Sequence, residues 1–402
     1  MTDQWVIVLG RNYASRLGMI RAAGEAGCKV AVIKTDKDKR TASRKEIVDA
    51  SSRYVKKYYC ARENDDEVII RLLISEFKGM SRKAVLLPTD DYTASLIDLN
   101  IDRLKPYFLF PSVRCEQGKV VQLMDKAVQK QLAMEAGLNV ARGWTAICRD
   151  GRYVIPDGVI YPCFIKPEVS FQGDKHFMQR CDDPAALREA LDRLAGRLDC
   201  RVLIEEYMEI EQEYAVPGLV LDTQVMIPGI IEMDISHLGV TGTGIIRPWG
   251  PKEEGYEDLK TMLGRLGFTG LVDVDMFRSG GRIYFIELNM RFGASGYALT
   301  ANGINLPQML IECLAGDHPS AGGDSYSLGK SAFANEKVCL QKYTNGEITW
   351  RGFKQLLATA DHTFVFSRKD PLPGAAFTVQ NDLRRGRKLL RRLLGRKQQK
   401  QV

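Results

Sequence analysis

The sequence predicts an α/β protein of two or three packed domains, and three observations support this fold class. The chain has 402 residues, which is too many for one simple hydrophobic core. It opens with two apolar segments, QWVIVL and KVAVI, separated by a helical segment, as in a βαβ unit. Two further apolar strands, joined by a polar turn, lie between Phe268 and Tyr297.

Composition and cysteine usage fit a soluble, cytoplasmic globular protein. Hydrophobic residues make up 45% of the chain and charged residues 27%. No apolar run has the length of a membrane span, and the N-terminus lacks a secretion signal. The nine cysteines are scattered and form no Cys-x-x-Cys pair. This pattern favours reduced thiols over disulfides or a zinc site.

The net charge of +7 belongs to the end of the chain. Nine basic residues and one acid lie between Asn381 and Val402, so the remaining chain is close to neutral at −1. We therefore expect no nucleic-acid surface on the folded domains. The segment LRRGRKLLRRLLGRKQQK places Leu389, Leu390, Leu393 and Leu394 on one side of a helix. Such a segment is either a peripheral contact with the inner membrane surface or a disordered solubilising tail.

The N-terminal part, residues 1–112, is predicted to be a Rossmann-like α/β domain. A strand at 4–9 is followed by a helix from about Ser15 to Ala26, which ends at Gly27, and by a second strand at 29–33. A complete Gly-x-Gly-x-x-Gly motif is missing, so a dinucleotide site is not supported.

Polar residues follow the later strand AVLLP of this domain, which ends at Pro88. Thr89, Asp90 and Asp91 then stand at the carboxyl end of a strand, where open α/β sheets usually bind ligands. Either Asp90 or Asp91 contacts an amine-bearing substrate, or one of them caps the next helix. The sequence leaves both interpretations open.

The stretch from Phe268 to Tyr297 carries the clearest chemistry. We expect strands at about 270–277 and 283–288, with a turn of about five residues, Ser279 to Ile283, that sets Asp275 opposite Glu287. Strand side chains alternate, so Glu287, Asn289 and Arg291 leave the chain on one face. Two carboxylates and an amide oxygen suit Mg²⁺ shared with phosphates, and Arg291 suits a developing negative charge. A surface hairpin with solvated acids is the alternative.

Asp275 followed by IYFIELNMR resembles the metal-binding signature of the ATP-grasp superfamily of carboxylate ligases. The resemblance implies ATP and Mg²⁺ as cofactors, with Asp275, Glu287 and Asn289 on the metal and Arg291 facing the phosphoryl transfer. It also implies a two-lobed ATP-grasp fold behind the N-terminal domain. The small lobe would cover 113–204 and the large lobe 205–330, before a C-terminal extension at 331–380 and a basic tail at 381–402.

The same resemblance assigns lysines to the ATP phosphates. Asp125-Lys126, in a helix predicted from about Gln117 to Ala136, is similar to the element that opens the nucleotide-binding part. Lys166 ends the strand YPCFIKP and would contact phosphate as a catalytic residue. The polar loop EVSFQGDK after it would be the phosphate lid, with contacts from Ser170 and Gly173.

Acidic residues after a short strand at 202–204 are implied to bind the nucleoside. The segment that follows such a strand in the family reads adenine through backbone groups, which assigns Glu205, Glu206 and Met208 to the base. Glu213 would take the ribose hydroxyls. A solvated acidic edge is the alternative for this run.

Within the superfamily, VIVLGRNYASRLGMIRAAGEAG, VLLPTDDYTASLIDLN and DPLP resemble the group that contains D-aspartate ligase. One residue departs from some relatives, since Asp273 stands where D-alanine–D-alanine ligases carry an arginine. An acid there would not stabilise an acyl phosphate, which would leave that role to Arg291 or another base.

The expected function is an ATP-dependent carboxylate–amine ligase that forms an amide through an acyl phosphate. Its partners would be small-molecule carboxylate and amine substrates, such as an amino acid or a cell-wall precursor, and a homodimer is left open. A phosphotransferase on the same fold and a non-catalytic ATP-binding protein are the alternatives. Residues 331–380 carry no motif whose chemistry can be read.

Overall fold

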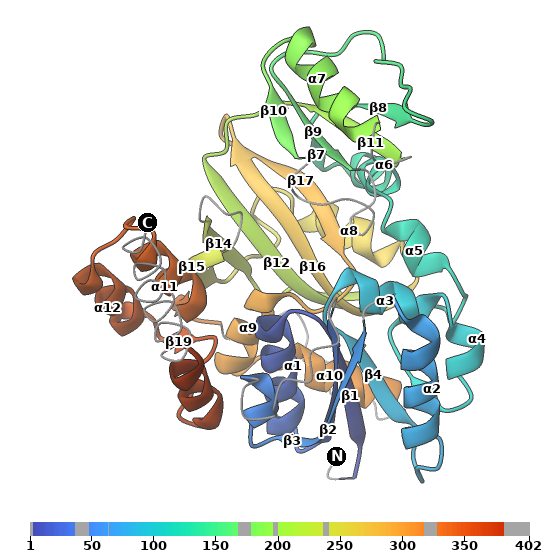
Figure 1. Cartoon of the computed structure of the whole chain (residues 1–402), viewed down its shortest axis with the longest axis vertical. Coiled ribbons are helices and arrows are strands. Elements are labelled where there is room, and N and C mark those ends of the chain that lie inside the picture. Colours follow the sequence, from blue (N-terminus) through green and yellow to red (C-terminus); the bar gives the residue numbers. More distant parts are fainter. Residues whose placement is uncertain are drawn as a thin grey trace, which may run out of the picture.

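The computed structural model describes residues 3–36, 48–62, 64–167, 178–195, 200–235, 241–316 and 328–381. The described chain contains three β-sheets, each with helices packed against it (Figure 1). The predicted phosphate lid with Ser170 and Gly173, and the basic tail beyond Asn381, lie outside the described residues. Among the described helices, none is long and apolar enough to cross a membrane.

The N-terminal domain is a parallel five-stranded sheet, as predicted. Its strand order is β3-β2-β1-β4-β5, and every neighbouring pair is parallel. The strands are β1 (Trp5–Gly10), β2 (Lys29–Asp36), β3 (Val55–Arg62), β4 (Ala84–Pro88) and β5 (Phe108–Leu109). The helical segments are α1 (Tyr13–Glu25), the 3-10 turn η2 (Asp49–Ser51), α2 (Asp66–Phe77), α3 (Asp91–Asp98) and α4 (Ile101–Leu104).

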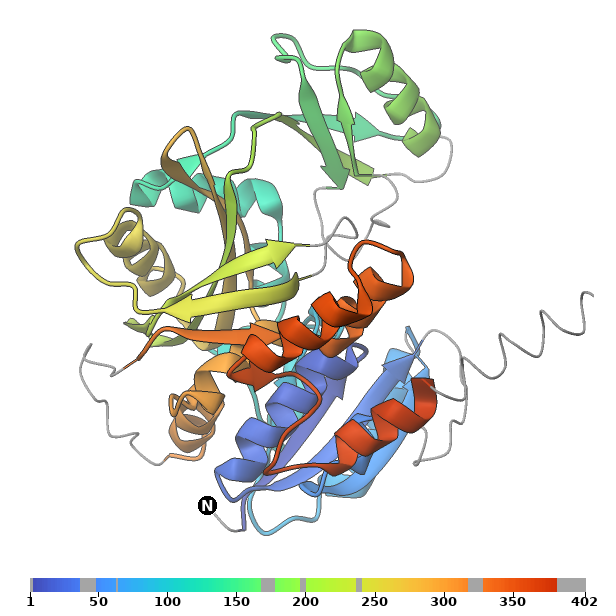
Figure 2. The same ribbon diagram turned by 90° about the vertical axis from the view of Figure 1, so that its left-hand side faces the viewer.

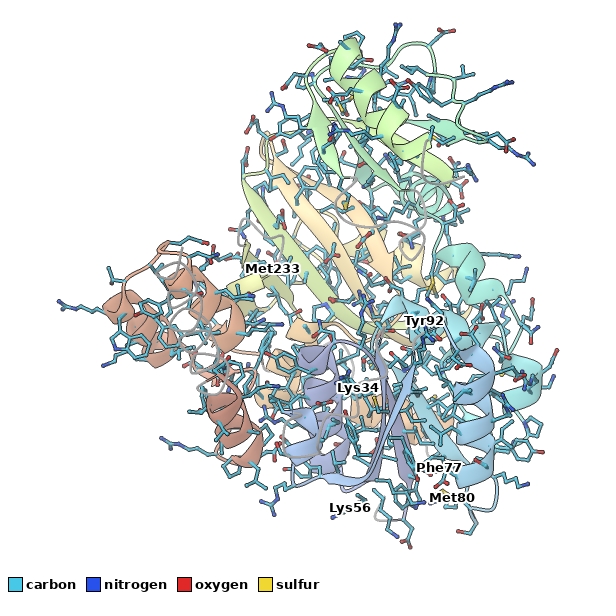
Figure 3. All side chains as sticks on the ribbon, in the orientation of Figure 1. Lys34, Lys56, Phe77, Met80, Tyr92 and Met233 are labelled. Atoms are coloured by element: carbon cyan, nitrogen blue, oxygen red, sulfur yellow. The ribbon has the colours of Figure 1, made fainter. Side chains whose placement is uncertain are left out.

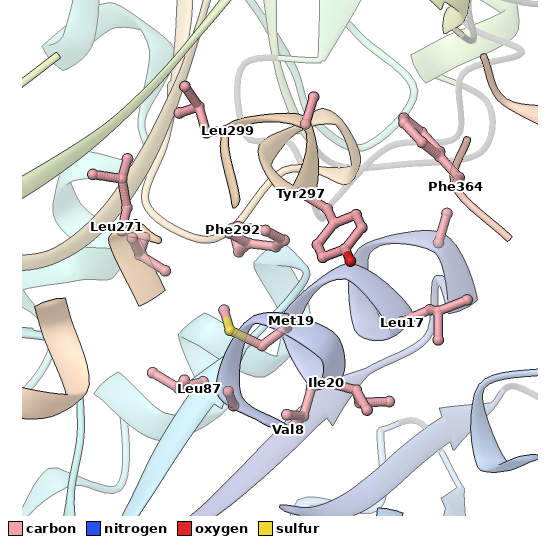
Figure 4. Packing of buried hydrophobic residues seen from close by; sticks show 14 of the residues in the cluster. Val8, Leu17, Met19, Ile20, Leu87, Leu271, Phe292, Tyr297, Leu299 and Phe364 are labelled. Carbon is pink, nitrogen blue, oxygen red and sulfur yellow. The ribbon is translucent and has the colours of Figure 1, made fainter. Parts of the chain in front are cut away.

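Helix α1 is buried on both of its faces. Asn12 starts it by accepting a hydrogen bond from the backbone N–H of Ala14, which is why the helix begins before the predicted Ser15. One face packs on β1 and the other on the loop and helix that follow the central hairpin (Figure 4). A Cβ on Gly18 would lie only 3.0 Å from Tyr297 and 3.1 Å from Phe292. This close packing joins the N-terminal domain to the rest of the molecule.

The small lobe is an antiparallel sheet of order β10-β9-β11-β8. It consists of β8 (Gly143–Cys148), β9 (Cys163–Pro167), β10 (Gln179–Cys181) and β11 (Cys200–Glu206), with α7 (Pro184–Ala195) packed on it. The single helix predicted for 117–136 is wrong. The chain forms α5 (Lys119–Leu123) and α6 (Lys126–Ala136), because the Asp125 side chain accepts the backbone N–H groups of Ala127 and Val128 and starts a new helix.

The large lobe is built on a ten-stranded sheet. Its main path is β19-β18-β15-β14-β12-β16-β17-β7, while β13 pairs with β12 and β6 with β16. The strands are β6 (Ser112–Val113), β7 (Asn139–Val140), β12 (Gln212–Asp222), β13 (Gln224–Met226), β14 (Ile230–Ile235), β15 (Thr241–Arg247), β16 (Phe268–Ser279), β17 (Arg282–Asn289), β18 (Ser331–Ala334) and β19 (His362–Thr363). Helices α8 (Tyr256–Gly264), η4 (Ala294–Gly296), α9 (Tyr297–Ala301) and α10 (Leu306–Leu314) accompany it.

The central hairpin consists of β16 and β17. Asp275 pairs with Glu287, as predicted, but the turn is tighter than the five residues expected, because Ser279 already pairs with Arg282. Gly280 and Gly281 form this two-residue turn with φ angles of 55° and 76°, which glycine adopts without steric cost. The register shifts by one residue between Asp275 and Met276, and this bulge lies directly beside the paired acids.

The C-terminal extension, for which the sequence offered no motif, spans both the large sheet and the N-terminal domain. Strand β18 continues the large sheet beside β15, and α11 (Glu336–Thr344), α12 (Trp350–Thr359) and a helix at 372–381 follow. Figure 2 shows this extension, coloured orange to red, against the N-terminal domain in blue. A buried ion pair of 3.1 Å joins Arg21 of α1 to Asp370, with both side chains 0% exposed.

Other bonds complete this junction. Arg21 also donates to the carbonyl oxygens of Phe364 and Val365 at 2.8 and 2.7 Å, while Asp370 accepts from the Ser52 hydroxyl and from the backbone N–H of Arg53. Because the Arg21 and Asp370 side chains are both fully buried, removing one charge would leave the other buried without compensation.

We predict that Arg21→Met lowers the free energy of unfolding by about 3–5 kcal/mol, because Asp370 keeps its charge and loses its cation. Urea denaturation followed by tryptophan fluorescence measures the change. Arg53→Met is the matched control, since the exposed Arg53 side chain donates only to the carbonyl of Lys369 and its backbone N–H is unchanged. Equal stability of the two variants would contradict a structural role for the buried pair.

Candidate active site

The hairpin brings together the residues predicted to bind metal. The Asn289 amide donates to a carboxylate oxygen of Asp275 at 3.1 Å, and the Lys126 ammonium lies 2.9 Å from the Glu287 carboxylate. Arg291 donates from Nη2 to the Asn289 side-chain oxygen at 2.9 Å. Lys126 and Asn289 are buried, at 7% and 6% exposure. Two sets of contacting side chains, Asp275–Asn289–Arg291 and Lys126–Glu287, are thus brought together by the strand pairing of Asp275 with Glu287.

Gln129, which the sequence analysis missed, positions Lys126 against the hairpin. Its side-chain amide donates to the carbonyl of Leu288 at 2.8 Å and accepts from the backbone N–H of the same residue at 2.9 Å. This two-bond contact fixes α6 on β17 beside Glu287. The signal in the sequence is weak, because a glutamine on a helix is usually solvent-facing.

Arg291 also connects the hairpin to the N-terminal domain. Its Nε donates to Asp91 at 3.2 Å, and its Nη1 lies 3.8 Å from Asp273. The sequence analysis left two roles open for Asp90 and Asp91, a helix cap and a contact at the site, and each residue takes one of them. Asp90 caps α3 by accepting from the backbone N–H of Thr93, whereas Asp91 faces the predicted catalytic arginine.

The site holds more negative charge than its surroundings compensate. Burial raises the pKa of Asp275 well above its ordinary value, and the neighbouring Asp273 and Glu287 raise it further. Burial also raises the pKa of Asp273. For Glu287 burial acts in the same direction, but Lys126, Lys166 and Arg291 outweigh it and lower the pKa to about 2. Arg291 opposes the rise in the pKa of Asp275 only in part, and among the described residues Asp275 forms no ion pair like that of Glu287 with Lys126.

The Asp273 carboxylate is the most closely packed side-chain group of the site. Its Oδ1 is buried and accepts no hydrogen bond from the described residues. A Cβ on Gly293 would lie 1.7 Å from its Oδ2, so the backbone after β17 is packed directly against the carboxylate. Only glycine fits at this position.

These residues fit a bound Mg²⁺ ion. Asp275, Glu287 and Asn289 supply hard oxygen donors, and a divalent cation would compensate the charge that raises the pKa of Asp275. Within the described residues, no group of three or more His, Cys, Asp or Glu side chains is arranged to hold a metal by itself. Mg²⁺ commonly binds through one or two carboxylates together with substrate phosphates.

A second buried group of charges joins the small lobe to α6. The carboxylate of Glu205 lies 2.7 Å from Lys166 and 2.8 Å from Lys130, and both lysines are at most 8% exposed. Lys130 also donates to the carbonyl of Ala141 at 2.6 Å. The sequence analysis missed Lys130, although it follows Lys126 by one helical turn and lies on the same face.

This group of charges includes Glu205, one of the residues predicted to bind the nucleotide, and lies next to others. The Glu205 carboxylate is engaged by two lysines, and that of Glu206 accepts from the backbone and side chain of Arg142. The backbone N–H of Glu206 itself donates to the carbonyl of Arg142 at 2.9 Å. Met208 is half-buried just after β11. Glu213 lies on β12, and burial raises the pKa of its carboxyl group.

A cavity of about 750 Å³ opens beside the hairpin. Asp273, Asp275 and Glu213 line it, together with residues of the β1–α1 loop and of α11. A second cavity of about 700 Å³ lies between the large sheet and α12. The two share Glu213 and Met233, and Figure 3 labels Met233 on β14. Asp275, one of the predicted metal residues, thus faces a space large enough for small substrates.

Comparisons with known proteins find ligases of similar sequence. A D-alanine–D-alanine ligase of Chlorobium phaeovibrioides is 30% identical over 223 residues, covering 50% of this chain and 61% of the relative. A D-aspartate ligase of Enterococcus faecium is 22% identical over 279 residues, covering 61% and 62%. The chain spans less than two thirds of the first curated relatives it matches, between 18% and 61% of each. No family model matches the chain.

Solved structures show the fold. The biotin carboxylase domain of the 2-oxoglutarate carboxylase of Hydrogenobacter thermophilus, solved with magnesium ADP, superposes with a TM-score of 0.62 at 20% identity. The match covers 81% of this chain and 73% of that one. These proteins are ATP-grasp proteins. The chain therefore has the ATP-grasp fold and is similar in sequence to ATP-grasp ligases, as the motif around Glu287 predicted, and the D-aspartate ligase among its relatives agrees with the narrower resemblance.

We predict that the stabilising effect of Glu205 depends on pH. Burial opposes ionisation of Glu205, but Lys166 and Lys130 outweigh it and hold its pKa below the ordinary value. A carboxylate with a lowered folded-state pKa stabilises the protein above the unfolded pKa of about 4.3, and this stabilisation is lost as the pH falls through the folded-state pKa. Glu205→Gln should therefore cost about 3–5 kcal/mol at neutral pH and progressively less below pH of about 4.

Urea denaturation of both proteins across this pH range measures the difference. Glu206→Gln serves as control and should cost under about 1 kcal/mol, because its partner Arg142 is 72% exposed. A Glu205→Gln deficit that is the same at every pH would show that ionisation of Glu205 contributes nothing.

Proposed function

We propose that the protein is an ATP-dependent carboxylate–amine ligase. The observation that carries the proposal is the group formed by Asp275, Glu287 and Asn289, flanked by Lys126 and Arg291, of which Asp275 lines the 750 Å³ cavity. Oxygen donors for a metal and cations for phosphate are what transfer of a phosphoryl group requires. The curated relatives include two ligases, and a structural neighbour was solved with magnesium ADP.

The proposed metal ligands are Asp275, Glu287 and Asn289. Bound Mg²⁺ would supply positive charge to the ATP phosphates and orient them. Lys126 already compensates Glu287 and lies where it can add a second positive charge beside a phosphate. Lys166 is positioned by Glu205 at the end of β9 and would contact the phosphates from the small lobe.

The proposed reaction has two steps. An oxygen of the substrate carboxylate attacks the γ-phosphorus of ATP, the bond to the β-phosphate oxygen breaks, and ADP leaves with its electron pair. The amine nitrogen of the second substrate then attacks the acyl phosphate carbonyl, loses a proton and expels phosphate, which leaves an amide. Arg291 reaches the site from the β17 end and would stabilise the negative charge of the transferring phosphoryl group.

Nucleoside contacts are proposed for the segment after β11 and for β12. The backbone groups of Glu205, Glu206 and Met208 would form hydrogen bonds with the base, and the Glu213 carboxylate would accept hydrogen bonds from the ribose hydroxyls. Ser170 and Gly173 stay predicted lid residues. Small-molecule carboxylate and amine substrates would enter the cavity from the side of the N-terminal domain, where the β1–α1 loop lines it.

Product analysis tests the proposed reaction. The purified chain is incubated with Mg-ATP and pooled amino acids, small carboxylates and cell-wall precursors, and the products are identified by mass spectrometry. ADP together with a condensed amide is the expected result. ADP with a stable phosphorylated metabolite would indicate a phosphotransferase, and AMP would contradict an acyl phosphate.

We predict that Glu287→Gln and Asn289→Ala each lower turnover by at least about a hundredfold, because each removes an oxygen ligand or its charge from the phosphate end of the site. ADP release measures turnover, and the Mg²⁺ dependence of nucleotide binding gives a readout that is independent of it. Circular dichroism should show an unchanged fold.

Glu257→Gln on α8, an exposed glutamate in the first turn of that helix, is the matched control and should behave as the unmodified protein. Full turnover in either site variant would refute the metal assignment.

A further inference from the structure

Lys130 is a buried cation to which the proposed reaction gives no role. It lies on α6 one helical turn after Lys126, so both side chains leave the same face of the helix, with their Cα atoms about 6 Å apart along its axis. The Lys126 ammonium lies 2.9 Å from Glu287 of the hairpin, whereas that of Lys130 lies 2.8 Å from Glu205 of the small lobe. Helix α6 therefore contacts both parts of the site through charged side chains (Figure 1).

The Lys130 ammonium is held by two protein acceptors. It donates to the carbonyl of Ala141 at 2.6 Å and to Oε1 of Glu205 at 2.8 Å. The backbone packs closely around it, because a Cβ on Gly143 would lie 2.8 Å from its Nζ. Since two of its three N–H groups are used and the side chain is 8% exposed, Lys130 is poorly placed to bind a ligand directly.

The Lys166 ammonium is held less completely. It lies 2.7 Å from Oε2 of Glu205, and within the described part of the chain it forms no other ion pair. An ammonium has three N–H groups, so further donors are left for an acceptor that is not part of this group. Burial lowers the pKa of Lys166, Glu205 opposes this shift, and Lys126 adds to it. The positive charge of Lys166 is therefore compensated only in part.

The three side chains carry one positive charge more than they balance. Glu205 is the only acid that pairs with the two lysines among the described residues, and each of its oxygens contacts one ammonium. The hairpin has the opposite imbalance, since burial and the neighbouring acids raise the pKa of Asp275. A phosphate group that carries Mg²⁺ would compensate both, with its oxygens on Lys166 and its metal ion on the hairpin.

We propose that Lys130 is a positioning residue for the phosphate contact of Lys166. Lys130 compensates Glu205 from the side of α6, and this leaves the charge of Lys166 available to a nucleotide phosphate. If Lys166 were the only cation beside Glu205, the two would form a neutral buried pair, and the carboxylate would hold the ammonium more firmly. The inference rests on the proposed function, in which Lys166 contacts the phosphates of ATP.

Binding of ADP and of adenosine separates the phosphate contact from contacts with the base and ribose. Titration calorimetry of the full chain at a fixed Mg²⁺ concentration gives both dissociation constants, and their ratio measures what the phosphates add. We expect the unmodified protein to bind ADP at least about a hundredfold more tightly than adenosine. Lys130→Met should reduce this preference about tenfold, because the phosphates then face a neutral pair. A purely structural role would weaken both ligands in parallel.

A double variant separates this charge effect from a loss of structure. Lys130→Met combined with Glu205→Gln removes one charge of each sign and leaves Lys166 as an unpaired cation. We expect the preference for ADP to return to within about threefold of that of the unmodified protein, whereas independent structural damage would add up in the double variant. Lys105→Met is the control and should leave both constants unchanged, because its ammonium pairs with Asp102 at the surface of the N-terminal domain.

The outcomes distinguish this inference from the proposed function. A full ADP preference in Lys130→Met, or a double variant with less preference than the single one, would overturn the positioning role while the ligase stands. Equal binding of ADP and adenosine by the unmodified protein would refute both. A preference that depends on Lys130, in a protein that forms no amide, would support the positioning role and contradict the ligase.

Discussion

Two carboxylates on neighbouring strands repel each other, and the register of β16 and β17 fixes Asp275 and Glu287 in that relation. The two-residue turn at Gly280 and Gly281 would by itself set Asp275 opposite Ile286, and the bulge beside Asp275 shifts the pairing to Glu287. The arrangement persists because Lys126 compensates one acid and the Asn289 amide bonds to the other. The strand pairing therefore requires compensating groups around the two acids.

Separate parts of the molecule supply the groups that surround these two acids. The N-terminal domain contributes Asp91, which positions Arg291, while α6 contributes Lys126. The small lobe contributes Lys166, whose burial lowers its pKa and whose partner Glu205 opposes that shift. A site assembled from separate elements in this way exists only in the fully folded chain.

Sequence patterns predicted the parts of this site that depend on local spacing. The alternation of Glu287, Asn289 and Arg291 follows from strand geometry. The pairing of Asp275 with Glu287 was predicted with a five-residue turn, whereas a two-residue turn and a bulge produce it. The break between α5 and α6 was also encoded, since Asp125 is a good helix cap, but the continuous periodicity concealed it. Contacts across domains carry no such local pattern. Nothing in the sequence links Asp91 to Arg291, or Lys130 to Glu205.

The sequence could not predict where the C-terminal extension packs, for a related reason. Its anchors are backbone carbonyl and N–H groups of residues 364–366, which every residue type possesses, received by Arg21 and Glu336. Such groups leave no trace in residue identity. Lys337 lines the 750 Å³ cavity because this docking places α11 there, which the sequence could not predict.

The packing of α1 decides which parts of the molecule are joined by apolar contacts. Gly18 packs between Phe292 and Tyr297, and Arg21 is bonded to the extension, so the N-terminal domain, the large sheet and the extension pack against one another. The small lobe has its own separate hydrophobic core. The ion pair between Lys130 of α6 and Glu205 of β11 joins this lobe to the helix beside the hairpin. The small lobe is therefore attached through charged side chains, whereas α1 joins the other parts largely through apolar packing.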